Sequence, residues 1–372
     1  MIKIRITKII FNIFVFLCIT SIFFFHNKSF LPVSSLLTLI LLTVFFHNIN
    51  KIKREILFEV IILLVYILYS LLIVFYYNIN FFDYLIVFLP FYNALILSPS
   101  VGKKILEKDD FEKLFFLLLY SFLIKYLYVV LLGIDDRPAL FRENNFELMI
   151  LIIMYIGLYH IKSGQLNLKI ISIITFIIAI SGSRSSLIEW IAVMFILHID
   201  LKKKYFIAKI ALLSITVLIF LYYLSQKIHA GSFESVDRVQ YFLSFFYEIR
   251  NWNLWKYLFG NPIITPLSYE TIQKYSYFSM SYGNPNIAYS VLLHAFVIRA
   301  ILDHGLFGLV FIFYFINKIL KISGYSKKER LAVLTVFFLN GFSVSSFMNI
   351  FGVMGLLFLI ILKNKRIAYV AK

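Results

Sequence analysis

The sequence predicts an all-α, polytopic integral membrane protein with about 12 transmembrane helices and one large external loop. Hydrophobic residues make up 61% of the 372 residues and charged residues only 15%, which is more apolar surface than a soluble domain can bury. Apolar runs of roughly 17–22 residues, each long enough to cross a hydrocarbon core of ~30 Å, recur along the whole chain. Between these runs lie short loops in which basic residues cluster.

The first apolar run is preceded by Lys3, Arg5 and Lys8, an arrangement typical of a signal peptide. No small-residue cleavage site follows, so we interpret this run as a retained span. The single cysteine, Cys18, lies inside it, which excludes an internal disulfide and a cysteine-based metal cluster. The predicted spans fall near 7–25, 30–47, 56–77, 82–98, 114–133, 146–161, 169–182, 186–200, 205–224, 292–317, 331–346 and 349–362.

The formal net charge of +17 is compatible with nucleic-acid binding, but its distribution indicates membrane topology instead. With the N-terminus inside, about 25 of the 36 Lys and Arg residues fall in cytoplasmic segments and about 10 outside, as the positive-inside rule requires. The opposite orientation would reverse that ratio. We therefore expect both termini in the cytoplasm and no nucleic-acid partner.

One external loop is long, spanning roughly residues 225–291 between the ninth and tenth spans. Pro and Gly residues break it into short helical pieces and turns. Phe242, Phe245 and Phe246, with Trp252 and Trp255, predict helices that lie on the membrane surface. There is no internal repeat, so residues 1–372 are expected to form one membrane domain covered by this loop.

A tight outward turn is predicted at Ser181-Gly182-Ser183-Arg184-Ser185-Ser186, where two apolar runs meet almost without a loop. It would place Arg184 at the outer face among backbone N–H groups and hydroxyls. That combination suits a phosphate or diphosphate, because guanidinium offers paired donors and a permanent charge. The alternative is that Arg184 reaches lipid headgroups or pairs with Glu189.

The outer loop before the sixth span contains Asp135-Asp136 together with Arg137 and Arg142. Paired aspartates are typical of a metal site for a nucleotide-sugar. A cytosolic nucleotide donor is absent on the outer side, however, and no second acidic cluster is evident. We therefore favour a solvated turn in which Arg137 or Arg142 is available to a diphosphate.

Two further sets of residues are candidates for binding substrate. Lys125 lies in the middle of the fifth span and must face a cavity or a partner, with a structural ion pair as the alternative. In the long loop, Arg238 offers another guanidinium, and Trp252, Trp255 and Tyr257 are placed to stack on sugar rings. The alternative for these aromatic residues is an interfacial belt.

His294 is the strongest catalytic candidate, because an imidazole titrates near neutral pH and can deprotonate a sugar hydroxyl. It stands at the start of an apolar helix, ten residues before Gly305-x-x-Gly308. Glycines on a lipid-embedded helix permit close helix approach. A lone histidine at a helix start is more often structural, and His304 is a rival base.

Arg299 and Asp303 follow His294 in the same apolar helix. Ionisable groups at that depth cost about 2.5–3.5 kcal/mol each on insertion scales, so they usually have a function or a partner. One helical turn separates them, which allows mutual neutralisation.

These residues resemble the superfamily of O-antigen polymerases (Wzy-type) and O-antigen ligases. Ser183-Arg184-Ser185-Ser186-Leu187 resembles the Ser-Arg motif that this family carries between consecutive spans. Arg238, followed by aromatic residues and Leu258-Phe259-Gly260, resembles the loop arginine ahead of a Leu-x-Gly turn. His294 with Gly305-x-x-Gly308 resembles the element that ends the large periplasmic loop. The topology extends the resemblance over the full chain.

The resemblance implies a GT-C-like, metal-independent inverting transferase without a cofactor, acting at the periplasmic face of the bacterial inner membrane. Its substrates would be undecaprenyl-diphosphate-linked oligosaccharides, and its partners membrane lipids and a chain-length regulator. Arg184 and Arg238, helped by Arg142 or Arg299, would stabilise the departing diphosphate. His294 would be the base for the acceptor hydroxyl.

Three alternatives stay open at this point. Within the enzyme class they are an O-antigen ligase and a capsule or exopolysaccharide polymerase. Outside it, a polyprenyl-linked oligosaccharide flippase also has about twelve spans, but we expect a flippase to have short loops on both sides and charges in a central cavity.

Overall fold

The computed structural model describes residues 6–24, 33–135, 137–141, 143–165, 167–198, 237–261, 264–275, 281–282, 284 and 286–363. The predicted ninth span, 205–224, lies outside the described residues, as does Arg142. The described chain is helical, and its one isolated backbone bridge joins Leu106 to Leu362. The expectation of an all-α fold is thus confirmed for the described residues.

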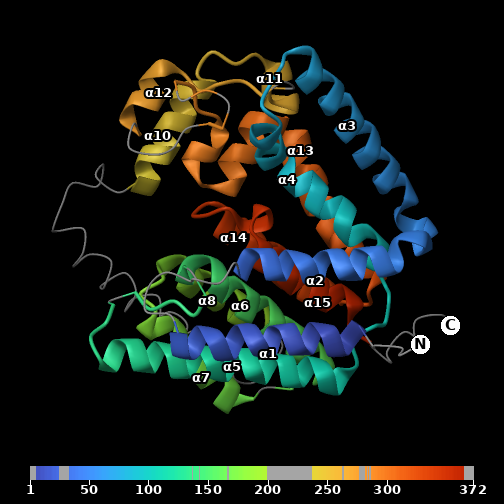
Figure 1. The fold of residues 1–372 in the computed structure, drawn as a ribbon, viewed down its shortest axis with the longest axis vertical. Helices are drawn as coiled ribbons and strands as arrows, with labels where there is room; N and C mark the ends of the chain where they lie inside the picture. The colour runs from blue at the N-terminus through green and yellow to red at the C-terminus, as the bar shows by residue number, and fades with distance from the viewer. Residues whose placement is uncertain are drawn as a thin grey trace.

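The other predicted spans correspond to α1–α8 and α13–α15 (Figure 1). Among the described helices, six are long and apolar enough to cross a membrane, namely α1, α3, α4, α5, α6 and α13. The bounds are α1 (Ile6–Phe24), α2 (Val33–Asn48), α3 (Leu57–Tyr76), α4 (Phe81–Leu97), α5 (Lys108–Leu131), α6 (Asn144–Ile161), α7 (Leu168–Ile180), α8 (Arg184–His198), α13 (Phe296–Ile322), α14 (Lys327–Gly341) and α15 (Ile350–Ile361).

Helix ends that the sequence assigns to one side of the membrane lie together in the structure. On the side assigned to the cytoplasm, the backbone N–H of Ile105 before α5 donates to the carbonyl of Ile361 at the end of α15 (2.9 Å). Lys162 after α6 pairs with Glu112 in the first turns of α5, with 2.8 Å between Nζ and Oε2. The opposite ends, which the sequence assigns to the outer side and which are called the outer ends below, meet likewise and form the candidate site.

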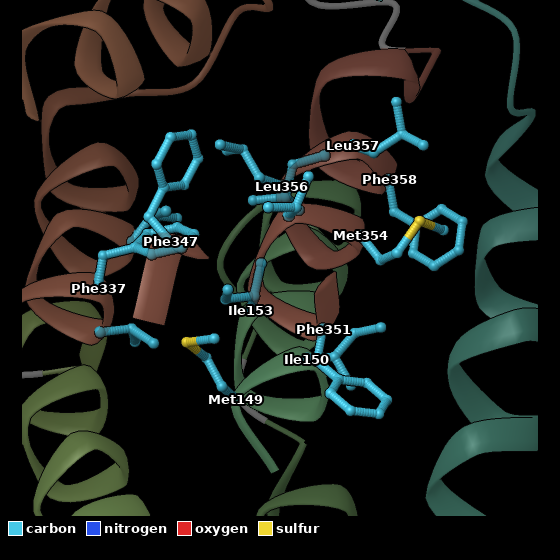
Figure 2. Close-up of a cluster of buried hydrophobic side chains, with 14 of the residues drawn as sticks. Met149, Ile150, Ile153, Phe337, Phe347, Phe351, Met354, Leu356, Leu357 and Phe358 are labelled. Atoms are coloured by element: carbon cyan, nitrogen blue, oxygen red, sulfur yellow. The ribbon is translucent and has the colours of Figure 1, made fainter. Parts of the chain in front are cut away.

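The centre of the bundle is the contact between α6 and α15. Two glycines of α15 allow the close approach: a Cβ added at Gly352 would overlap the side chain of Met149, and one at Gly355 would lie 3.0 Å from Cγ2 of Ile153. Small residues at such contacts favour packing between apolar helices. Figure 2 shows the side chains that fill this region, from α6 (Met149, Ile150, Ile153), α14 (Phe337), the 3-10 turn η6 (Ser346–Met348) and α15 (Phe351, Met354, Leu356, Leu357, Phe358).

The tenth predicted span differs from the expectation of one continuous helix over 292–317. Helix α13 starts at Phe296 and is broken at Gly305, whose backbone has φ 67° and ψ −174°. That conformation is essentially confined to glycine. Hydropathy reports only that a segment is apolar, and so could not show the break. The break divides α13 into a first half before Gly305 and a longer second half after it.

The external loop folds into short helices, as the sequence predicts. They are α10 (Asp237–Ile249), α11 (Leu254–Phe259), α12 (Tyr269–Lys274) and the 3-10 turn η5 (Ser290–Leu293). They gather around the first half of α13 (Figure 1). The loop has its own small apolar core, in which Tyr241, Phe245 and Tyr275 pack with Ile298 and Leu302 of α13. It is thus attached to the membrane domain by burial of apolar surface.

Candidate functional site

The Ser-Arg turn connects α7 to α8 and is fixed by the start of α6. Nδ2 of Asn144 donates to the carbonyl of Ser181 (2.7 Å), and Oγ of Ser183 donates to Oδ1 of Asn145 (2.7 Å). Arg184 is the first residue of α8 and is half-buried. Within the described chain it forms no ion pair with Glu189, which accepts from another residue. Arg184 is therefore presented at the outer end of α8 on a rigid turn.

His294 occupies the turn between η5 and α13 and has a left-handed backbone, with φ 53° and ψ −27°. For a residue other than glycine this conformation costs about 1–3 kcal/mol and persists where the surroundings impose it. The imposing contacts come from the segment after α14: the N–H of Phe296 donates to the carbonyl of Val344 (3.0 Å), and Oγ of Ser345 donates to the carbonyl of His294 (3.5 Å). The histidine is half-buried. Backbone strain of this kind is concentrated at functional sites.

Helix α10 brings Arg238 to the same region. The ring of Tyr241 on α10 lies 5.7 Å from the ring of His294, and the ring of Phe242 stacks on Phe342 after α14 at 5.9 Å. Residues three apart share a face of a helix. Arg238 therefore lies on the face of α10 that carries Tyr241 toward His294, and it is half-buried.

Asn340, in the last turn of α14, links the Ser-Arg turn to the His294 turn. Its Nδ2 donates to the carbonyl of Asn145 (3.3 Å) and to Oε1 of Glu189 (2.9 Å). Its own carbonyl accepts from the N–H of Val344 (2.8 Å), the residue whose carbonyl holds Phe296. The elements that carry the three predicted catalytic residues thus meet around the outer end of α14.

Two of the predicted binding residues form contacts with other parts of the chain. Arg137 is exposed in the turn before α6, where its N–H donates to Oδ1 of Asp135 (2.9 Å). Lys125 is buried; its Nζ lies 3.5 Å from the carbonyl of Ile22 in α1 and 5.9 Å from the centre of the Tyr128 ring. The first contact joins α5 to α1, and the second lies within α5.

The three aromatic residues predicted to stack on sugars divide into two kinds. Trp252 and Tyr257 pack on each other at 5.6 Å, and the Tyr257 hydroxyl donates to the carbonyl of Ile249 (3.2 Å), so both help to fold the loop. Trp255 is 67% exposed and stacks on Phe259. Among the three, Trp255 presents an open ring face.

The two glycine motifs are in contact with each other. Gly260, which ends α11, has φ 71° and ψ −156°, and a Cβ added there would overlap backbone atoms of Gly305 and His304. The N–H of Asn261 donates to the carbonyl of Leu302, which the break in α13 leaves without a helical partner (3.0 Å). Gly305 thus serves close approach, as expected, but its neighbour is the external loop and not another spanning helix.

A buried polar centre lies between α4 and α13; the sequence indicates its ionisable residues on α13 but not their partners on α4. Pro90 in α4 has no N–H, so the carbonyl of Ile86 loses its helical donor. Nη2 of the buried Arg299 lies 3.5 Å from this carbonyl, and Nε2 of His304 lies 3.2 Å from the next one, of Val87. A proline inside an apolar run, facing ionisable residues on another, was the signal available in the sequence.

His304, the rival base, is occupied on both ring nitrogens. Its Nδ1 lies 2.9 Å from the Tyr66 hydroxyl of α3, so the tautomer that satisfies both contacts carries its proton on Nε2. Phe88 and Phe91 enclose the ring at 4.9 and 4.6 Å. The residue borders an apolar cavity of about 740 Å³ that α3, α11 and α13 also line, including Phe307. This environment suits a structural imidazole.

Asp303 does not pair with Arg299. It accepts from Oγ of Ser290 instead, and no ion pair joins the two charged residues in the described structure. Nε of Arg299 has no hydrogen-bond partner there. Tyr289 directly precedes Ser290. Burial raises the pKa of the Tyr289 phenol, and the Asp83 carboxylate raises it further. The first half of α13 is therefore polar on the side that faces α4.

The class that the fold defines is an all-helical protein whose long apolar helices fit a membrane, with a folded loop at one end of the bundle. Comparison with known proteins finds no family model that matches the chain and no matching curated protein.

Proposed function

We propose that the protein is a polysaccharide-assembling glycosyltransferase, an O-antigen polymerase of the Wzy type. It joins undecaprenyl-diphosphate-linked oligosaccharide units at the outer face of the inner membrane. The observation that supports this proposal most is the meeting of Arg184, the face of α10 that carries Arg238, and the strained His294 turn around the outer end of α14.

The chemistry requires a base and a cationic site, but no nucleotide fold, because the donor is already activated. A hydroxyl oxygen of the incoming unit forms a bond to the anomeric carbon of the growing chain. The bond from that carbon to the diphosphate oxygen breaks, and the electron pair leaves with undecaprenyl diphosphate. The hydroxyl proton passes to His294. Arg184 and Arg238 stabilise the charge that develops on the diphosphate.

The folded external loop favours this function over a flippase. The loop buries Tyr241, Phe245 and Tyr275 against the first half of α13. A cap of this kind, next to an arginine and a histidine, serves a reaction that takes place at the outer face. A transporter that alternates between faces has no evident use for it.

The test is the saccharide profile of a deletion strain complemented with variants. Single repeat units on the lipid core indicate a polymerase, whereas none at all indicates a ligase or a flippase. We expect His294→Ala and Arg184→Ala to abolish chain extension while the protein still inserts. Arg250→Ala is the control, because Arg250 is an exposed arginine of the same loop that stacks on Tyr247 at 3.7 Å. Normal polymer ladders from both test variants would remove the mechanism.

A further inference from the structure

Glu189 and Asn340 form a buried polar contact between α8 and the last turn of α14. Both side chains are fully buried. Nδ2 of Asn340 donates to Oε1 of Glu189 at 2.9 Å. Two oxygen atoms of this pair, Oε2 of Glu189 and Oδ1 of Asn340, have no hydrogen-bond partner in the described structure. Two buried acceptors left unsatisfied beside each other require an explanation.

In the described part of the chain, no cation forms an ion pair with Glu189. The titratable groups on α8 and on the helices that pack against it are Arg184 and His198 (α8), Glu147, Tyr155, Tyr159 and His160 (α6), Lys169 (α7), and Lys327, Lys328, Glu329 and Arg330 (α14). None of these forms a hydrogen bond or ion pair with Glu189 within the described chain. The cations of α14 lie in its first turn, ten or more residues before Asn340, at about 15 Å along the helix.

A buried carboxylate without a cation is strongly unfavourable, and such a group takes up a proton instead. A proton on Oε2 of Glu189 also supplies the donor that Oδ1 of Asn340 lacks. We propose that Glu189 is protonated in the folded protein and forms a doubly hydrogen-bonded acid–amide pair with Asn340, which positions the Ser-Arg turn relative to the His294 turn. In this pair Oε2–H donates to Oδ1, and Nδ2–H donates to Oε1.

The contacts of Asn340 explain how the pair positions the Ser-Arg turn relative to the His294 turn. Its amide also holds the carbonyl of Asn145, whose side chain accepts from Ser183 beside Arg184. Its carbonyl holds Val344, next to the turn of His294. This positioning role rests on the proposed function, whereas the protonation does not.

The test uses variants of the full chain in detergent micelles. Glu189→Gln keeps the pair, because the glutamine amide donates to Oδ1 and its carbonyl accepts from Nδ2. At about pH 5 we expect its Tm to stay at the wild-type value, and that of Glu189→Ala to fall by at least about 2–4 °C. Glu59→Gln is the matched control, since Glu59 is buried but paired with Lys318, and its Tm should fall. The infrared band of a protonated carboxyl should disappear in Glu189→Gln.

The pH dependence gives an independent measure. A carboxyl that is protonated when folded and ionised when unfolded makes folding take up a proton, so stability falls as pH rises above about 4.3. Relative to Glu189→Gln, the wild type should lose Tm between about pH 5 and pH 8.

Two outcomes would overturn the proposal. If Glu189→Gln loses as much stability as Glu189→Ala and removes no carboxyl band, the group is ionised, whatever the polymer assay shows. If Glu189→Gln folds like wild type but yields no polymer, the pair does not act by positioning. Failure of the proposed function would appear separately, as normal ladders from the His294 and Arg184 variants.

Discussion

Gly305→Ala tests whether the contact between the external loop and the break in α13 holds the loop in place. The backbone at Gly305 is in a region that costs an alanine about 1–3 kcal/mol. The added Cβ would also overlap the carbonyl of Leu258 and the N–H of Gly260. Overpacking of this kind costs typically about 1–3 kcal/mol more. The free energy of unfolding should therefore fall by about 2–6 kcal/mol.

Gly133→Ala is the matched control, because Gly133 also has a positive φ, of 61°, but nothing lies within 4 Å of an added Cβ. It should lose only about 1–2 kcal/mol. Thermal unfolding in micelles measures both losses, and limited proteolysis of the segment 237–295 measures detachment of the loop. We expect rapid cleavage in Gly305→Ala alone. Equal Tm values and equal cleavage rates for the two variants would refute the reasoning.

Three further variants test other contacts. Tyr66→Phe leaves Nδ1 of a buried imidazole without its donor and should cost about 1–3 kcal/mol; a loss no larger than that of the exposed Tyr69→Phe would contradict this. Glu329→Gln should lower Tm at neutral pH, because burial raises the pKa of Glu329 but its contacts with His160 and Ser326 together lower it below its usual value. The wild-type advantage should vanish as pH falls below about 4 and the carboxyl is protonated, and an advantage that persists in acid would disprove the assignment. Trp255→Ala should change stability by less than about 0.5 kcal/mol yet weaken oligosaccharide binding in a titration, and unchanged binding would exclude a stacking role.

Several helices could be placed from the sequence because a long apolar run predicts a helix long enough to cross a membrane. Helices α3 and α4, for example, begin and end within a residue or two of the predicted 56–77 and 82–98. Breaks inside such runs could not be placed in the same way. The backbone of Gly305 is set by the approach of Gly260, forty-five residues away in the chain, and no local pattern records that contact.

The sequence indicated which residues are candidates for the site, but it indicated only some of the contacts that these residues form. The spacing of His294 from Gly305 indicated the segment that contacts the external loop, but the sequence could not show that Arg299 faces a carbonyl released by Pro90. Nor could it separate Trp255 from Trp252, since exposure depends on how the loop folds on itself. The burial and the partners of these side chains depend on tertiary contacts, which composition and spacing do not encode.

The glycine contact between α11 and α13 has a consequence for protein engineering. The segments 254–261 and 296–308 fit each other at Gly260 and Gly305 through backbone atoms, which cannot adapt to a new neighbour as a side chain can. Exchange of the external loop between related chains, for instance to alter which sugars are accepted, must therefore transfer both segments together. A graft that carries only the loop would meet a foreign helix break and leave the Leu302 carbonyl unsatisfied.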